Sequence, residues 1–248
     1  GYEILKDKTG GERKYRCWKT HGEVNFWRAV ADSCDVYFYL LGAKVGPDAI
    51  SRMAIACGFG ETVLKLLPGE RAGIVPNPLW KRRRGLGGWS TGDTFNMAIG
   101  QGFVACTPLQ AASFMAGVAT QGQFWKPFVV KKMIDSSGAE IFTGKSELRR
   151  SLLLKESTWT TIHTALNMVV EKGTGYGAFV PYLDIKGKTG TAQNPHGIDH
   201  AWFVGFAGYR DEKPSVAICV MIENGGGGGA IAAPIAAKLL RLALPEKA

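Results

Sequence analysis

The sequence predicts an α+β domain with an antiparallel sheet flanked by helices, and two observations support this fold class. Apolar residues recur at helical spacing in several segments, most clearly over 155–172. Three consecutive strand-like segments, 184–192, 201–209 and 215–222, then precede a last helix over 234–244. Because strands joined by short connections pair antiparallel, helices followed by sequential strands favour an α+β arrangement.

The earlier elements follow from capping residues, breakers and apolar period. Asn25 and Pro47 are residue types that begin helices, and Gly58 stops the second of these helices. In chain order we predict a loop or weak hairpin over 1–22, helices over 26–41 and 48–56, a long irregular excursion over 61–93, a helix over 109–119, and a hairpin over 124–143 that turns at 136–138. We find no internal repeat and no linker, so one domain portion spanning 1–248 is expected.

Composition describes an ordinary globular protein. Of 248 residues, 46% are hydrophobic and 21% charged, which is typical of a folded chain with a substantial core. The sequence has no run of about 18 apolar residues, so it predicts no membrane-spanning segment here. The net charge of +9 is partly concentrated in the block Lys81–Arg84. No aromatic platform is interleaved with that block, so we expect a solvated loop and no nucleic-acid partner.

The strand over 184–192 carries Lys188-Thr189-Gly190-Thr191. Alternation along a strand places Lys186 and Lys188 on one face. A lone Lys-Thr-Gly is a weak signal, because three common residues recur by chance. A second short motif, Ser33-Cys34-Asp35, lies where a helix would end in a turn. Taken alone, that motif is a helix C-terminal turn without chemistry.

Other segments of the sequence support a functional reading of the two motifs. With the segments 92–102, 107–110 and 201–207, they resemble the penicillin-binding transpeptidases over essentially the whole chain, and most of all the class B, elongation-type branch. The resemblance implies a penicillin-binding/serine β-lactamase-like transpeptidase fold, here a partial domain. It also implies a D,D-transpeptidase that crosslinks peptidoglycan stem peptides by serine acyl transfer and is a target of β-lactams.

The resemblance assigns roles to the strand motif. Lys188 would supply positive charge beside the cleft, and the hydroxyls of Thr189 and Thr191 would bind the carboxylate of the peptide or β-lactam. Gly190 would let the substrate backbone approach closely, since glycine has no side chain. The backbone N–H of Thr191 would provide one oxyanion-hole donor. The strand itself would pair with the substrate peptide.

The turn motif would complete the proton transfer. The resemblance implies that Ser33 relays a proton to the leaving amine, and that Asp35 binds the substrate amide or fixes Ser33. The family nucleophile belongs to a Ser-x-x-Lys motif, yet no serine of this sequence has a lysine three residues later. Ser151 comes nearest, with Lys155 four residues on. We therefore expect the nucleophile upstream of Gly1 and the chain alone to be inactive.

Cys17, His21 and Cys34 form a candidate structural zinc site. Zinc takes thiolate and imidazole ligands, and the resemblance implies that these three residues hold a metal that braces the turn motif. A fourth ligand would lie around or before Gly1, with Asp7 as a weaker local substitute. The alternative is that Cys34 packs as a small apolar residue while His21 lies in solvent. Acyl transfer itself requires no cofactor.

Two rival functions remain open at this point. A β-lactamase or β-lactam sensor of the same fold would share the motifs, and a non-catalytic cell-wall scaffold would retain only the fold. For a transpeptidase, the resemblance implies stem peptides and β-lactams as ligands. It also implies a glycosyltransferase and scaffold proteins of the elongation complex as partners. The location would be the periplasmic face of the bacterial inner membrane, with the anchor outside this chain.

Overall fold

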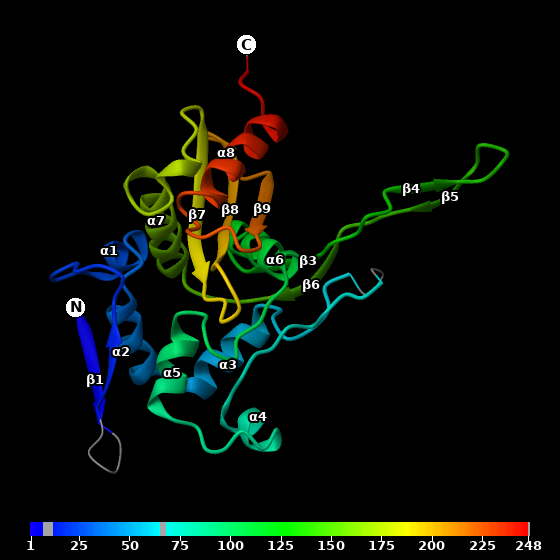
Figure 1. Ribbon diagram of the computed structural model, residues 1–248. Coiled ribbons are helices and arrows are strands. Elements are labelled where there is room, and N and C mark those ends of the chain that lie inside the picture. The colour runs from blue at the N-terminus through cyan, green and yellow to red at the C-terminus, as the bar shows by residue number, and fades with distance from the viewer. Residues whose placement is uncertain (7–11, 65–67, 248) are drawn as a thin grey trace.

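The computed structural model describes residues 1–6, 12–64 and 68–247 (Figure 1). Its elements, in chain order, are β1 (Tyr2–Lys6), β2 (Glu12–Arg16), α1 (Phe26–Ala31), α2 (Asp35–Val45), α3 (Pro47–Ala56), α4 (Pro78–Arg83), α5 (Thr91–Ala98), α6 (Pro108–Ala119), β3 (Gln123–Lys126), β4 (Lys132–Ile134), β5 (Glu140–Thr143), β6 (Glu147–Ser151), α7 (Glu156–Lys172), the 3-10 turn η1 (Tyr176–Ala178), β7 (Leu183–Ala192), β8 (His200–Tyr209), β9 (Val216–Ile222) and α8 (Ala232–Ala243). The predicted α+β class is confirmed.

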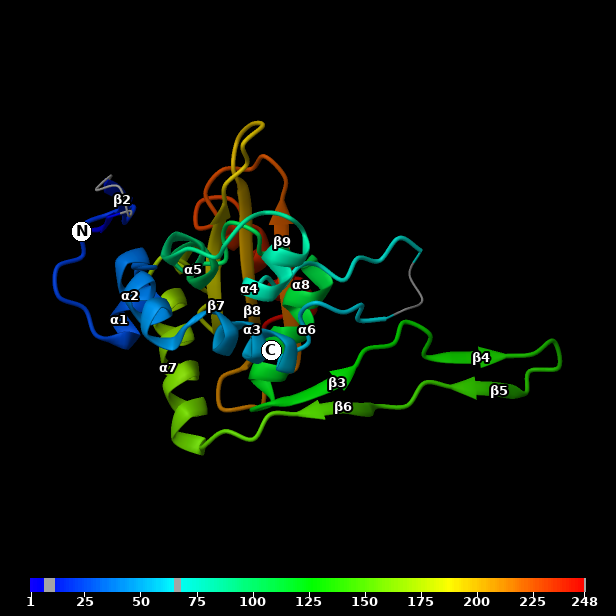
Figure 2. The same ribbon diagram turned by 90° about the horizontal axis from the view of Figure 1, so that it is seen from below.

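The central sheet has the order β7-β8-β9, and all its pairs are antiparallel. Successive side chains of a strand point to opposite faces, so Phe203 and Phe206 of β8 lie on different sides of the sheet. Phe203 packs with Leu240 of α8, whereas Phe206 packs with Met115 of α6 and Trp159 of α7. Helix α8 therefore covers one face, and α6 with the first half of α7 covers the other (Figures 1 and 2). This sandwich holds β7 in place.

One predicted helix is divided in two. The expected helix over 26–41 is broken between α1 and α2, because Ser33 adopts the left-handed region with φ 53°. Such a φ is unfavourable for a residue with a Cβ and needs support from its surroundings. The Trp18 indole provides it, donating to the carbonyl oxygens of Asp32 at 3.1 Å and Ser33 at 3.0 Å. The Ser33-Cys34-Asp35 motif thus forms a corner between α1 and α2 that is held by hydrogen bonds from Trp18.

The excursion over 61–93 is less irregular than predicted. Asn77 caps the short helix α4 with Pro78 at its start, and Ser90 with Asp93 forms a capping box at α5. The expectation of a wholly solvated basic block is wrong for Lys81, which is 9% exposed and donates to Asp93 Oδ2 at 2.7 Å. Burial requires such a pairing of the ammonium group. The other three members, Arg82–Arg84, are exposed.

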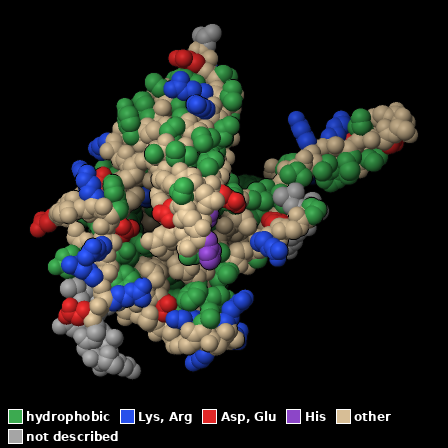
Figure 3. Space-filling model, viewed as in Figure 1, with side chains coloured by type: hydrophobic (Ala, Val, Ile, Leu, Met, Phe, Trp, Pro, Cys, Tyr) green, Lys and Arg blue, Asp and Glu red, His purple; other side chains and the backbone are tan. Residues whose placement is uncertain are grey.

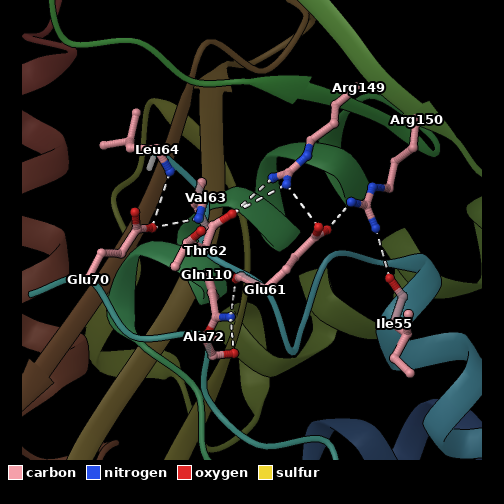
Figure 4. A network of polar contacts seen from close by, with 10 residues as sticks. All are labelled: Ile55, Glu61, Thr62, Val63, Leu64, Glu70, Ala72, Gln110, Arg149 and Arg150. Carbon is pink, nitrogen blue, oxygen red and sulfur yellow. Dashed lines mark hydrogen bonds and ion pairs between the residues drawn. The ribbon is translucent and has the colours of Figure 1, made fainter. Parts of the chain in front are cut away.

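An arm leaves the body through β3 and β6, and β4 with β5 forms its far end (Figures 1 and 2). The predicted hairpin is confirmed, and the structure extends it with the β3–β6 pair. A polar network holds the root of the arm (Figure 4). Glu61 accepts from Arg149 at 2.9 Å and also from Arg150, while Arg150 donates to the Ile55 carbonyl at 2.8 Å. Buried Gln110 donates to the Glu61 carbonyl at 2.8 Å, which links the root to α6.

Within the described residues, no helix is both long and apolar enough to cross a bilayer. The candidate metal ligand Asp7 lies outside the described part of the chain. The predicted weak hairpin over 1–22 is present as the β1–β2 pair, in the register Tyr2 opposite Arg16.

Candidate active site

The two sequence motifs meet across the open side of β7. This strand is an edge of its sheet, because β8 is its only partner among the described strands. Lys188 points from β7 to the α1–α2 corner, where its Nζ donates to Ser33 Oγ in a short contact. The same Nζ donates to the Thr189 carbonyl at 3.0 Å. Residues 155 positions apart in the sequence are thereby brought into direct contact.

Thr174 joins this pair, and the sequence analysis missed it. Its Oγ1 lies 3.3 Å from Ser33 Oγ and 2.7 Å from Thr189 Oγ1. The loop after α7 can reach the corner because Gly173 has no side chain. A Cβ at this position would stand 2.4 Å from the Ala31 carbonyl oxygen. The Thr174 N–H donates to that oxygen at 3.0 Å. The signal available in the sequence was a Gly-Thr-Gly break directly after a strong amphipathic helix.

The network gives the Ser33 proton a direction. An ammonium group has donors only, so Ser33 Oγ accepts from Lys188 and its own hydrogen is free to point elsewhere. That hydrogen can go to Thr174 Oγ1 or to a group in the open cleft. Hydroxyls and an ammonium linked in this way polarise one another. The arrangement suits a proton relay.

Asp35 faces the segment before α1. Its carboxylate accepts from the Trp18 N–H at 3.3 Å, and its own N–H donates to Cys17 Sγ at 3.2 Å. Burial raises the pKa of the Asp35 carboxyl, while the Trp18 hydrogen bond and the charge of Lys188 act in the opposite direction. Of the two roles expected for Asp35, these contacts agree with fixing the Ser33 corner.

Lys188 is poised to change charge near neutral pH. Desolvation in the cleft lowers the pKa of its ammonium group from 10.5 to about 8, and the nearby Asp35 carboxylate offsets part of that fall. Burial disfavours the charged form of a lysine, and an opposite charge favours it. Lys186, on the same face of β7, instead pairs with Asp184.

Thr191, at the end of the motif, lies next to a glycine-rich loop over 225–229, whereas the Thr189 hydroxyl contacts Thr174. Thr191 is exposed, and its Oγ1 accepts from the Gly228 N–H at 3.3 Å. Gln101 Nε2 donates to the Thr191 carbonyl at 3.1 Å and fixes the end of the strand. A Cβ on Gly190 would stand 3.2 Å from Trp202 Cβ, so a side chain there would crowd the neighbouring strand β8. The glycine-rich loop therefore packs against the end of β7.

Gly228→Ala is expected to lower the free energy of unfolding by about 1–3 kcal/mol. A Cβ on Gly228 would stand 2.3 Å from the Gly190 carbonyl oxygen and 2.4 Å from that of Trp202. Both are backbone atoms of the sheet, so the loop must move away from Thr191. Urea unfolding measures the effect. Gly227→Ala is the matched control, because nothing lies within 4 Å of that Cβ, and equal effects of both variants would contradict the explanation.

The three predicted metal ligands form one cluster beside the corner. The donor atoms of Cys17, His21 and Cys34 all lie within 4.8 Å of one another, and Cys17 Sγ is 3.4 Å from His21 Nδ1. A tetrahedral zinc ion with bonds of about 2.3 Å to sulfur and about 2.0 Å to nitrogen places such ligands about 3.5 Å apart. His21 Nε2 is buried without a hydrogen-bond partner in the described structure. The donor set fits a zinc ion.

The geometry does not favour the apolar alternative for Cys34. Cys34 is buried, which raises the pKa of its thiol, but the thiol lies beside a second thiol and an imidazole, and His21 Nε2 is buried and not in solvent. Metal binding would reverse the protonation preference, because a coordinating thiol is deprotonated. All five cysteines are free thiols in the structure.

A Lys-Thr-Gly edge strand that meets a Ser-x-Asp corner defines the class of penicillin-binding and serine β-lactamase-like domains. Residues 1–241 match the family described as "Penicillin binding protein transpeptidase domain". The chain belongs to this family of transpeptidase domains.

Individual proteins agree with this assignment. The chain is 36% identical to the peptidoglycan D,D-transpeptidase MrdA of Acinetobacter baumannii over 242 residues, which cover 90% of this chain and 35% of MrdA. It resembles the crystal structure of Pseudomonas aeruginosa PBP2 in complex with WCK 5153 with a TM-score of 0.84 and 33% identity, over 100% of this chain and 53% of that one. The Helicobacter pylori PBP2–MreC complex matches with a TM-score of 0.74 and 30% identity, over 96% and 44%. The chain therefore spans about a third of the curated relative's length.

Proposed function

We propose that this chain forms the substrate-binding wall of a serine-type peptidoglycan D,D-transpeptidase of cell elongation. The observation that carries the proposal is the contact of Lys188 with Ser33, continued through Thr174 to Thr189 on an open edge strand. No serine of the sequence has a lysine three residues on. We therefore propose that the nucleophile comes from a part of the protein outside these 248 residues, and that the chain alone is inactive.

The proposed reaction uses each group for one task. The stem peptide pairs with the outer edge of β7, and its terminal carboxylate binds the hydroxyls of Thr189 and Thr191 beside the Lys188 charge. The serine oxygen bonds to the penultimate D-Ala carbonyl carbon, and the oxyanion is bound in part by the Thr191 N–H. The bond to the terminal D-Ala breaks as its nitrogen takes, through Ser33, the proton that the serine hydroxyl gave up. An acceptor amine of a second stem peptide then displaces the serine.

We further propose a structural zinc ion held by Cys17, His21 and Cys34. The ion would supply no step of acyl transfer and would cross-link the 17–21 segment to the α1–α2 corner. Trp18 and Asp35 already join these parts, so the metal would stiffen the corner that carries Ser33. The fourth ligand is left to a group outside the described cluster.

The partners and location are proposed from relatives. The H. pylori relative was solved in complex with MreC, which supports a scaffold protein of the elongation complex as a partner here. A glycosyltransferase of the same complex and the periplasmic face of the inner membrane complete the proposal. The anchor would lie outside this chain.

Penicillin labelling of the complete protein tests the proposed function against both rivals. A fluorescent penicillin should label the nucleophile and remain bound for many minutes, because the cleft shows no additional carboxylate contacting the Lys188–Ser33–Thr174 network within the described residues. Release within seconds would identify a β-lactamase. Absence of labelling would identify a non-catalytic scaffold.

The acylation rate of the complete protein is expected to fall as pH rises through about 8, the pKa of Lys188. Deprotonation removes the positive charge that attracts the substrate carboxylate, so the rate should drop by about tenfold per pH unit beyond that point. A pH profile of second-order acylation by a penicillin measures this limb. It should vanish in Lys188→Arg, whose guanidinium stays charged. A rate that rises through pH 8 would show that neutral Lys188 acts instead as a base.

A further inference from the structure

The far end of the arm exposes several large apolar side chains. We define the distal arm as residues 128–143, which include β4 and β5 and are all exposed. Seven large apolar side chains in it are between 39% and 65% exposed, namely Phe128, Val129, Val130, Met133, Ile134, Ile141 and Phe142. Scattered exposed apolar residues are normal on a protein surface, but a contiguous patch marks an interaction site.

These side chains form an apolar ribbon that covers both faces of the hairpin, because Ile134 and Ile141 are the neighbours of Met133 and Phe142 along their strands and so point to the opposite face. Met133 lies opposite Phe142 in the register, so both stand on the same face. Gly144 extends that face, and the Phe128 ring lies 2.7 Å from where a Gly144 Cβ would be. Figure 3 shows the apolar side chains running along the projecting arm, well clear of the body.

The root of the arm is fixed. Arg149 and Arg150 of β6 are held by Glu61, as described above. On β3, the Phe124 ring is 5% exposed and fills the space beside Gly117, where a Cβ would stand 2.2 Å from it. The apolar ribbon is therefore presented in a set direction from the body. Such presentation lowers the entropic cost of binding a partner.

Strand edges on both sides of the ribbon are open. Among the described residues, β4 pairs only with β5, so the outer N–H and C=O groups of each are unpaired. A lone two-stranded hairpin is marginal in water, and a third strand stabilises it. An open edge is a template for strand addition, in which backbone bonds give affinity and alternate side chains give specificity.

The ion pairs of the arm leave two of its lysines unpaired. Lys126 pairs with Glu147 at 3.0 Å and Lys132 with Glu140 at 2.7 Å. Asp135 is used within the turn, where it accepts from the Ser137 and Ala139 N–H groups. Two further lysines, Lys131 inside the distal arm and Lys145 just after it, have no ion pair among the described residues, so an acidic segment bound along the hairpin could pair with them.

We propose that the distal arm binds a partner protein by adding one of its strands, an extended segment that alternates apolar and acidic residues. A membrane is a poorer occupant, because open strand edges cannot be satisfied in lipid and the tip of the ribbon, 135–138, is polar. A second copy of the chain is disfavoured by its net charge of +9. This inference is independent of the catalytic proposal.

Fluorescence anisotropy of labelled peptides on the intact protein tests the inference. The probes are a ten-residue peptide alternating Val and Glu and the same peptide with Lys for Glu. We expect the Glu peptide to bind at least tenfold more tightly, and hydrogen exchange to slow at amides of β4 or β5. Phe142→Ser should weaken binding at least tenfold. The double change Lys131→Glu with Lys145→Glu should reverse the preference between peptides.

Leu242→Ser is the matched control, because Leu242 is 79% exposed on α8, outside the arm. Far-UV circular dichroism should be unchanged in every variant. Equal binding of both peptides, no measurable binding, or binding that survives Phe142→Ser would overturn the inference. Binding of the protein to phosphatidylglycerol vesicles would also overturn it if that binding is lost in Phe142→Ser. The same holds for dimerisation of the protein, since each result would assign the ribbon to another occupant.

Discussion

Lys188→Met is expected to lower the rate of β-lactam acylation in the complete protein by about 10²–10⁴-fold. Methionine has nearly the same length but neither charge nor donor. Ser33 Oγ would then lose its ammonium partner, and the substrate carboxylate would lose the positive charge beside its site. Stopped-flow acylation by a chromogenic cephalosporin, reported as the second-order rate constant, measures the effect.

Stability measurements separate this loss from unfolding. Lys188 has a pKa lowered to about 8 from 10.5, so the folded state binds its proton less well than the unfolded state. The cost of burying the charge is fully present below pH 8 and is relieved as pH rises toward 10.5. The methionine variant should therefore be no less stable than the wild type at pH 7, and the difference should narrow toward pH 10.

Lys186→Met is the matched control. Lys186 lies two residues away on the same face of β7 but pairs with Asp184, so its replacement should change the acylation rate by less than about twofold. If the Lys188→Met variant is acylated at the wild-type rate, or if both variants lose the same fraction of that rate, Lys188 has no place in the proposed mechanism.

The fold was predictable where one local signal dominated. Three strand-like segments over 184–222 predicted the central strands, and the long helical period over 155–172 predicted α7, each to within one or two residues. The predicted helix bounds over 26–41 were wrong at Ser33, because a helical apolar pattern continues through the corner, although the motif itself was expected in a turn; the contact that holds the break comes from Trp18. A contact between residues 15 positions apart has no signature in local spacing.

Most residues of the site could be predicted from the sequence, but the contacts between them could not. Lys188 and Ser33 came from motifs whose meaning depended on a family resemblance, and the structure brings them together. Thr174 carries no motif that spacing can recognise. It belongs to the site because Gly173 lets the chain pass close to Ala31, and that close approach exists only after α7 has packed on α1.

Removing the proposed zinc ion is expected to lower the thermal unfolding midpoint of the protein substantially. The protein prepared without chelator should contain one zinc per chain, and Cys34→Ser should reduce that to near zero. A ligand present at a thousand times its Kd stabilises by about 4 kcal/mol, which corresponds to about 8–16 °C in the unfolding midpoint of a domain of this size. Inductively coupled plasma analysis and calorimetry, with and without chelator, measure both quantities.

The metal prediction also reaches the active site, because the cluster and Ser33 share one corner. Chelation should slow β-lactam acylation as well as lower the midpoint, since Cys17 accepts the Asp35 N–H and the Ser33 carbonyl depends on Trp18, which follows Cys17 directly. Cys57→Ser is the control, because this half-buried cysteine lies outside the cluster and its loss should leave zinc content unchanged. Zinc well below one equivalent in the wild type, or a chelated protein with unaltered midpoint and acylation, would show instead that Cys17, His21 and Cys34 support the corner by packing alone.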